Sequence, residues 1–193
     1  MHRLTASFVL AYHGCDKAVA EKLLLREDFK LSQNEYDWLG TGIYFWEANP
    51  IRGLEFAKEV QGLARGQKIE MPAVVGAVVE LGLCLDLTTS AGIQQVKDSY
   101  PEYVKACEAA GYPLLTNSSD QLRRPLDCAV INLLHEVRIK TGQLPIDTVR
   151  GVFVEGEPIY DGAGIRHKTH IQICVCNPEC IKGIFRVPEH QLS

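Results

Sequence analysis

Residues Leu39–Phe45 read Leu-Gly-Thr-Gly-Ile-Tyr-Phe, and an earlier stretch, Tyr12–Gly14, reads Tyr-His-Gly. Each stretch adjoins a short apolar run, Ser7–Tyr12 or Ile43–Trp46, and such runs bounded by glycine are typical of buried β-strands. Glycine next to a functional side chain lets a ligand approach the backbone closely. The two stretches therefore predict two strand ends that present a histidine and a tyrosine to a ligand.

Capping signals and apolar periodicity predict the remaining elements. Asp16 can cap a helix that runs to about Arg26, and Asn49 followed by Pro50 is a typical helix start. Further predicted elements are a strand at Ala73–Leu81, a mixed helical and irregular region at Thr88–Pro125, a helix at Leu126–Lys140, and strands at Gly151–Val154, Thr169–Cys176 and Ile181–Val187. Strands gathered at both ends with helices between them favour an α+β fold in a single domain, residues 1–193.

Composition indicates a globular protein and excludes disordered and fibrous classes. Apolar residues make up 46% of the chain and charged residues 23%, which are ordinary values. The net charge of −4 argues against a surface built for bulk attraction to nucleic acid or membranes. No apolar run is long enough to span a bilayer, and the seven cysteines are not paired in spacing, so a soluble cytoplasmic protein is expected.

The ordered motifs resemble the ADP-ribosyltransferase superfamily, in particular its poly(ADP-ribose) polymerase-like branch with a His-Tyr-Glu signature. The matching pieces are Tyr12–Gly14, Leu39–Phe45 and the terminal run Gln172–Val175. The resemblance covers both ends of the chain and hardly touches the middle. It implies a fold of split mixed β-sheets flanked by helices, and NAD as a substrate with no metal.

The resemblance also implies roles for individual residues. His13 would contact the adenosine ribose of NAD by donating a hydrogen bond, and Gly14 would bind the nicotinamide amide through its backbone. Tyr44 would stack on the nicotinamide ring, and Phe56, at a slightly different spacing from the family's second aromatic residue, would cover its other face. Gly53 stands where the family has a serine that holds the carboxamide. Taken singly, these residues also fit purely structural roles, His13 as a hydrogen-bonded core histidine and Tyr44 as an ordinary strand aromatic.

The third signature position departs from the family, because Gln172 stands where the catalytic glutamate is expected. A glutamine can orient a ribose hydroxyl but cannot stabilise positive charge on the sugar. A charge-assisted hydrogen bond contributes roughly 1.5–3 kcal/mol against about 1 kcal/mol for a neutral one. The exchange therefore costs about 1–2 kcal/mol, or about tenfold in rate. Considered alone, a strand glutamine is usually an exposed residue.

Three nearby carboxylates, Glu47, Glu155 and Glu157, are candidate helpers for Gln172. A zinc site is not expected among the C-terminal cysteines and histidines, because no second Cys-x-x-Cys pair completes a tetrahedron. That group comprises Cys174, Cys176, Cys180, His167 and His170. The cysteines are instead expected to be small buried apolar side chains.

These observations favour an enzyme that transfers a single ADP-ribose unit from NAD to a macromolecular acceptor and releases nicotinamide. A small transferase domain of this kind looks like a bacterial toxin or defence effector with a cognate inhibitor or antitoxin, by analogy alone. The acidic net charge favours a protein acceptor, whereas the basic segment Arg166–Lys168, unless it is only a solvated loop tip, favours nucleic acid. The alternatives are a catalytically degenerate NAD- or ADP-ribose-binding module and an NAD glycohydrolase.

Overall fold

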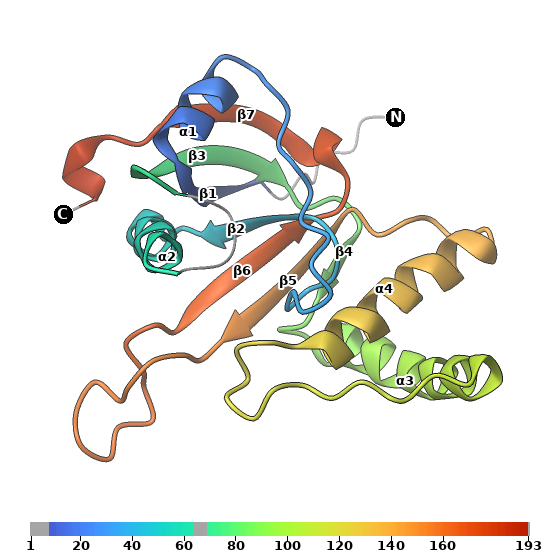
Figure 1. The fold of residues 1–193 in the computed structure, drawn as a ribbon. Coiled ribbons are helices and arrows are strands. Elements are labelled where there is room, and N and C mark those ends of the chain that lie inside the picture. The colour runs from blue at the N-terminus through green and yellow to red at the C-terminus, as the bar shows by residue number, and fades with distance from the viewer. Residues whose placement is uncertain (1–7, 64–68, 193) are drawn as a thin grey trace.

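The computed structural model describes residues 8–63 and 69–192 and shows a mixed α and β architecture (Figure 1). The strands are β1 (Phe8–Asp16), β2 (Ile43–Glu47), β3 (Pro72–Glu80), β4 (Cys84–Asp86), β5 (Thr148–Phe153), β6 (His170–Val175) and β7 (Ile181–Arg186). The α-helices are α1 (Lys17–Leu24), α2 (Pro50–Gln61), α3 (Ser90–Ala110) and α4 (Pro125–Lys140), and Pro178–Cys180 and Glu189–Gln191 are short 3-10 helices. The predicted α+β class is confirmed.

The strands form one seven-stranded sheet in the order β4-β5-β6-β2-β1-β3-β7. β4 and β5 are parallel, and every other neighbouring pair is antiparallel. The ladder between β1 and β2 is narrow, with the registered pairs Ala11–Glu47 and Tyr12–Trp46, whereas β1 pairs with β3 along all of Phe8–Asp16. The sheet is therefore continuous, but a short seam joins its two groups of strands.

The predicted capping residues begin the helices as expected. The Asp16 side chain accepts a hydrogen bond from the Ala18 backbone N–H at the start of α1, and Asn49 accepts one from Arg52 at the start of α2. Gly111 ends α3 in the left-handed conformation, with a φ of 69°. β4 was not predicted from the sequence, because three residues are too few to show a period of two.

Successive side chains of β1 point to opposite faces of the sheet, and α1 and α2 pack on these two different faces. Cys15 packs with Ala20 and Leu23 of α1, while Gly14 lies against Gly53 of α2. In Figure 1, α3 and α4 lie together beside the β4–β5 end of the sheet. The chain segments 111–124 and 154–169 emerge at the same lower end of the fold, below β5 and β6. Within the described ranges, no helix has the length and apolar character that crossing a membrane requires.

Candidate functional site

The three signature positions lie on three neighbouring strands. The sheet order β6-β2-β1 brings Gln172, Tyr44 and His13 to the two sides of the seam. Trp46 of β2 is directly opposite Gln172 of β6 and also opposite Tyr12, the residue before His13. Residues distant in the sequence are thus brought to one region of the sheet, where Tyr44 and Gln172 share a face and His13, packed against Phe45, lies on the other.

His13 bridges the point where β1 and β2 diverge. Its Nδ1 donates a hydrogen bond to the Tyr44 carbonyl at 2.8 Å, in place of a ladder hydrogen bond. The imidazole lies against Phe29 and Phe45, with ring centroids 5.3 and 5.7 Å away, and burial lowers the pKa of His13. The neutral ring therefore offers Nε2 as an acceptor. A ribose hydroxyl would donate to it, the reverse of the polarity expected from the sequence.

Gly14 makes a close contact with the backbone of α2. A Cβ atom at position 14 would be 2.0 Å from the Gly53 carbonyl oxygen, so both positions require close approach of strand and helix. This packing explains the two glycines without a ligand. The expected contact between the Gly14 backbone and a nicotinamide amide stays a prediction.

Tyr44 anchors the turn that precedes β2. Its hydroxyl donates to the Gly40 carbonyl at 2.6 Å and accepts from the Leu39 backbone N–H at 2.9 Å. Burial, with smaller contributions from Cys174 and Asp37, raises the pKa of Tyr44 above its usual range. The phenol therefore stays protonated, and its hydrogen-bonding capacity is used within the fold.

Replacing Tyr44 with phenylalanine should lower the free energy of unfolding by about 2 kcal/mol, because a buried donor and a buried acceptor lose their partner. Urea unfolding followed by circular dichroism measures the change. Tyr160→Phe is the matched control, since Tyr160 is 66% exposed. Equal midpoints for the two variants would show that the Tyr44 hydroxyl does not stabilise the turn.

Gln172 and Phe56 both lie next to Trp46. The Gln172 side chain is partly buried, and its amide has no hydrogen-bond partner among residues 8–63 and 69–192. The Phe56 ring contacts Trp46 at a centroid distance of 4.8 Å, so the aromatic residue in direct contact with Phe56 is Trp46 and not Tyr44. Trp46 was not expected from the sequence to take part in the site.

The three candidate carboxylates have different surroundings. Glu47 forms a two-pronged ion pair with Arg150 at 2.6 and 3.0 Å and is committed to it. Glu157 is exposed in the loop that follows β5. Glu155 lies 3.6 Å from His170 Nδ1 and 3.5 Å from Arg52, beside the strand that carries Gln172. Of the three, Glu155 is the one whose side chain contacts β6, the strand that carries Gln172, and it does so at His170.

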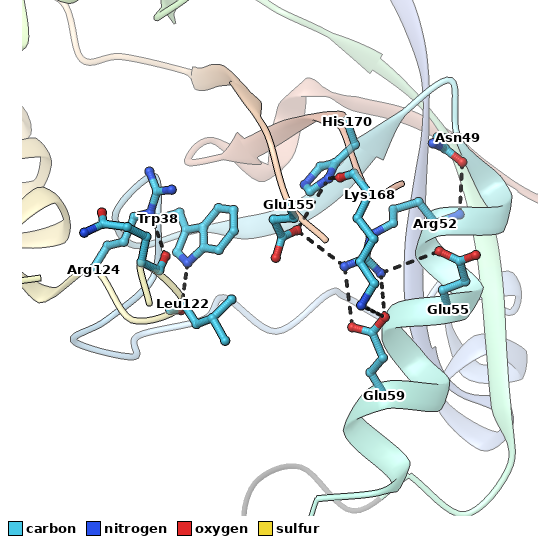
Figure 2. Close-up of polar contacts among 11 residues, drawn as sticks. Trp38, Asn49, Arg52, Glu55, Glu59, Leu122, Arg124, Glu155, Lys168 and His170 are labelled. Carbon is cyan, nitrogen blue, oxygen red and sulfur yellow. Dashed lines mark hydrogen bonds and ion pairs between the residues drawn. The ribbon is translucent and has the colours of Figure 1, made fainter. Parts of the chain in front are cut away.

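A buried cluster of charged and aromatic side chains surrounds Glu155 (Figure 2). Arg52 is 5% exposed, and its guanidinium lies 3.3 Å from Glu59, 3.5 Å from Glu155 and 3.9 Å from Glu55. The same guanidinium lies 5.9 Å from the centre of the Trp46 ring. The arginine charge is thus balanced by carboxylates from α2 and from the loop after β5.

His170 is the second buried polar residue of this cluster. Its Nδ1 donates to the Lys168 carbonyl at 2.6 Å, and its ring has aromatic neighbours on several sides, with centroid distances of 6.4 Å to Trp38, 6.4 Å to Trp46 and 5.9 Å to Phe153. Burial is the main cause that lowers the pKa of His170. The imidazole is therefore neutral and carries its lone pair on Nε2.

Three buried polar atoms of the cluster lack a hydrogen-bond partner among the described residues: Trp46 Nε1, Arg52 Nε and His170 Nε2. Buried polar atoms are normally paired, so three such atoms around one tryptophan mark this region as unusual. For two of these residues the sequence held a signal, because alternation along a strand places Trp46 on the same face of β2 as Tyr44 and His170 on the same face of β6 as Gln172. Arg52 had no comparable signal.

A cavity of about 330 Å³ adjoins the cluster between the two loops at the lower end of the fold. Trp38 and Glu155 belong both to the cavity wall and to the cluster, and Arg124 and Arg166 also line the wall. The Arg124 guanidinium lies 4.4 Å from the centre of the Trp38 ring. The cavity therefore combines an aromatic wall, two guanidinium groups and two carboxylates, those of Asp120 and Glu155.

The cysteines are separate from this site. All seven are free thiols, and Cys176 Sγ lies 3.8 Å from His135 Nε2. Hydrogen bonding by Cys174 and, to a smaller extent, by His135 lowers the pKa of Cys176 to about 6. Across the part of the chain that the structure describes, no group of three or more histidine, cysteine or acidic side chains is arranged to hold a metal ion.

Comparison with models of known protein families, with curated proteins and with solved structures finds no match to this chain.

Proposed function

We propose that this protein is an NAD-dependent ADP-ribosyltransferase that adds a single ADP-ribose unit to a macromolecular acceptor. The observation that carries the proposal is the strand order β6-β2-β1, because it gathers Gln172, Tyr44 and His13 at one seam of the sheet. The narrow ladder between β1 and β2 supports assignment to the split-sheet fold of that superfamily. The adjoining cavity, with aromatic, cationic and acidic groups, suits a ligand that has flat rings and phosphates.

In the proposed reaction, the bond between ribose C1′ and the nicotinamide nitrogen breaks, and its electron pair leaves with nicotinamide, which becomes neutral. A nucleophilic atom of the acceptor forms the new bond to C1′ and loses a proton to water. The Gln172 amide would orient one ribose hydroxyl, and the His13 Nε2 acceptor, which lies on the other face of the sheet beside Phe45, would orient another where β1 and β2 diverge at the seam. Glu155 would supply the negative charge that Gln172 lacks, favouring the positively charged sugar of the transition state.

Release of nicotinamide from NAD tests this proposal. Wild-type protein is incubated with NAD labelled in the adenosine half and a cell lysate, and both free nicotinamide and labelled macromolecule are measured. Gln172→Glu should raise the rate of release about tenfold, because it restores a carboxylate. His13→Ala should lower it at least about tenfold. Lys182→Ala on β7, far along the sheet from the seam, is the control and should leave the rate unchanged.

The absence of released nicotinamide with every protein and nucleic-acid acceptor in the lysate would disprove the transferase proposal. NAD binding without release would then identify a binding module, which the glutamine at position 172 favours as the second candidate function. Release with free ADP-ribose and no labelled macromolecule would identify a glycohydrolase. Protease or nuclease digestion of a labelled product distinguishes a protein acceptor from a nucleic-acid acceptor.

A further inference from the structure

The end of β6 brings a thiol and an imidazole together from two distant parts of the chain. Cys176 directly follows the last residue of β6, and its Sγ lies 3.8 Å from Nε2 of His135 on α4. Both residues are partly exposed, so the pair is open to small molecules in solution. A histidine beside a cysteine stabilises the thiolate, which is the nucleophilic form of the side chain.

The backbone fixes the position of Cys176, and a second thiol lies behind it. The Cys176 N–H donates to the carbonyl of Asp147, just before β5, at 2.9 Å. Cys174 is fully buried, and its thiol has two acceptors within reach, the Gly40 carbonyl at 3.7 Å and the Cys176 sulfur. A charged sulfur is the stronger acceptor of the two. The Cys176 sulfur is therefore held between two groups that favour its negative charge.

The titratable and charged groups around Cys176 come from four segments. Hydrogen bonding by Cys174 lowers the pKa of Cys176 most, burial and Asp147 raise it, and the hydrogen bond and charge of His135 lower it. Cys180, whose pKa burial raises to about 11, is the fourth group and stays a neutral thiol. The resulting pKa of Cys176 is about 6, so about nine-tenths of this side chain is thiolate at pH 7.

The other six thiols lack this combination of exposure and an imidazole partner. Five of them are buried, namely Cys15, Cys107, Cys128, Cys174 and Cys180. Cys84 is partly exposed, as Cys176 is, but burial raises its pKa. Cys84 is therefore an internal reference for a thiol that solvent reaches but that remains protonated at neutral pH.

We propose that Cys176 and His135 form a reactive thiol–imidazole pair, at whose sulfur hydroperoxides form a sulfenic acid. The Cys176 thiolate attacks the terminal oxygen of the peroxide, so that an S–O bond forms and the O–O bond breaks. Sulfur loses two electrons and the peroxide gains them. The departing oxygen takes a proton from the His135 imidazolium and leaves as water or an alcohol. Thiolate character and exposure together select the cysteine that such oxidants modify.

This inference goes beyond the proposed function and does not depend on it, because neither residue belongs to the transferase site described above. A hydroperoxide is the chemical class that suits the pair, since a small oxidant reaches a partly buried sulfur more easily than a bulky electrophile does. The imidazole also supplies the proton that the departing oxygen needs, which a thiolate alone cannot provide.

Alkylation by iodoacetamide, which reacts with thiolates, measures the state of each sulfur. The full-length protein is treated between about pH 5 and about pH 10, and mass spectrometry of its peptides gives a rate for each cysteine. The rate at Cys176 should rise through a midpoint near pH 6, as the thiolate forms, and level off above about pH 8. The rate at Cys84 should still be rising at about pH 9.

At pH 7, Cys176 should react at least about fivefold faster than Cys84, because its larger thiolate fraction outweighs the lower intrinsic nucleophilicity of a low-pKa thiolate. His135→Gln keeps a polar side chain and removes the positive charge, so it should raise the midpoint by about one pH unit. His167→Gln, at an exposed histidine in the loop after β5, is the matched control and should leave the midpoint unchanged. Near-ultraviolet circular dichroism verifies that each variant is folded.

Hydrogen peroxide followed by dimedone, which traps sulfenic acids, tests the oxidation itself. Dimedone should label Cys176 at least about fivefold more than Cys84 in the wild-type protein. The proposal is overturned if dimedone labels no cysteine or prefers another one, or if the alkylation midpoint of Cys176 lies above about pH 8. A midpoint that His135→Gln leaves unchanged also overturns it, because the imidazole would then play no part. The comparison of Cys176 with Cys84 in wild-type protein holds even where a variant does not fold.

Discussion

Replacing Gly14 with alanine should lower the free energy of unfolding by about 3 kcal/mol or more. The new Cβ would be 2.0 Å from the Gly53 carbonyl oxygen and 2.9 Å from its carbon. Both atoms belong to the backbone of α2, so no side chain can rotate to relieve the overlap. The helix must move off the strand, and overpacking of this kind commonly costs about 1–3 kcal/mol and more where relaxation is blocked.

Urea unfolding of Gly14→Ala and wild type measures this change. Gly183→Ala is the matched control, because Gly183 is also in a strand and no atom lies within 4 Å of its added Cβ. We expect the control to be unchanged or stabilised by up to about 1 kcal/mol, since alanine has less conformational freedom in the unfolded chain. If both variants unfold at the same urea concentration, α2 does not pack against Gly14 as described.

Replacing Arg52 with methionine should lower the free energy of unfolding by about 3 kcal/mol. Arg52 is 5% exposed, and its removal leaves the Glu155 carboxylate, whose side chain is 16% exposed, without a permanent cationic partner. Removing one member of a buried ion pair typically costs about 3–5 kcal/mol, because the remaining charge is desolvated. The partial exposure of Glu59 and Glu55 places the expected value at the lower end of that range.

Chemical denaturation again provides the measurement, with Arg186→Met as the matched control. Arg186 makes a shorter, two-pronged pair with Glu21 at 2.7 Å, but its side chain is 67% exposed. Water and ions screen such a pair, so its loss should change stability little. The double variant Arg52→Met, Glu155→Gln should recover part of the loss, and a loss of the same size as in Arg52→Met alone would contradict the ion-pair explanation.

Local sequence was sufficient for most elements of the fold. The caps at Asp16 and Asn49 and the apolar period of α4 depend on neighbours within a few residues, and the structure confirms them. β4 was not predicted because its existence depends on pairing with β5, a strand that lies far along the chain. The single continuous sheet was not predicted either, since two residue pairs at the seam decide it.

The candidate site was also predictable only in part, because local motifs indicate strands but not the contacts between distant segments. Glycine, histidine and tyrosine in an ordered motif indicated the strands of the seam, and the sheet order brings their positions together. The motif did not indicate that His13 donates to the Tyr44 carbonyl, nor that Gly53 covers Gly14. Those contacts depend on how β1 and β2 diverge and how closely α2 approaches.

The sequence by itself determined the class of fold, the helix starts and the strands that carry the signature residues, because capping and periodicity are local properties. Only the tertiary structure decided which polar groups are buried together. Trp46, Arg52 and His170 come from a strand, a helix and a distant strand, and each looks ordinary in its own segment. Their polar atoms lack partners because packing shields all three from water at one place, and no local sequence pattern predicts such packing.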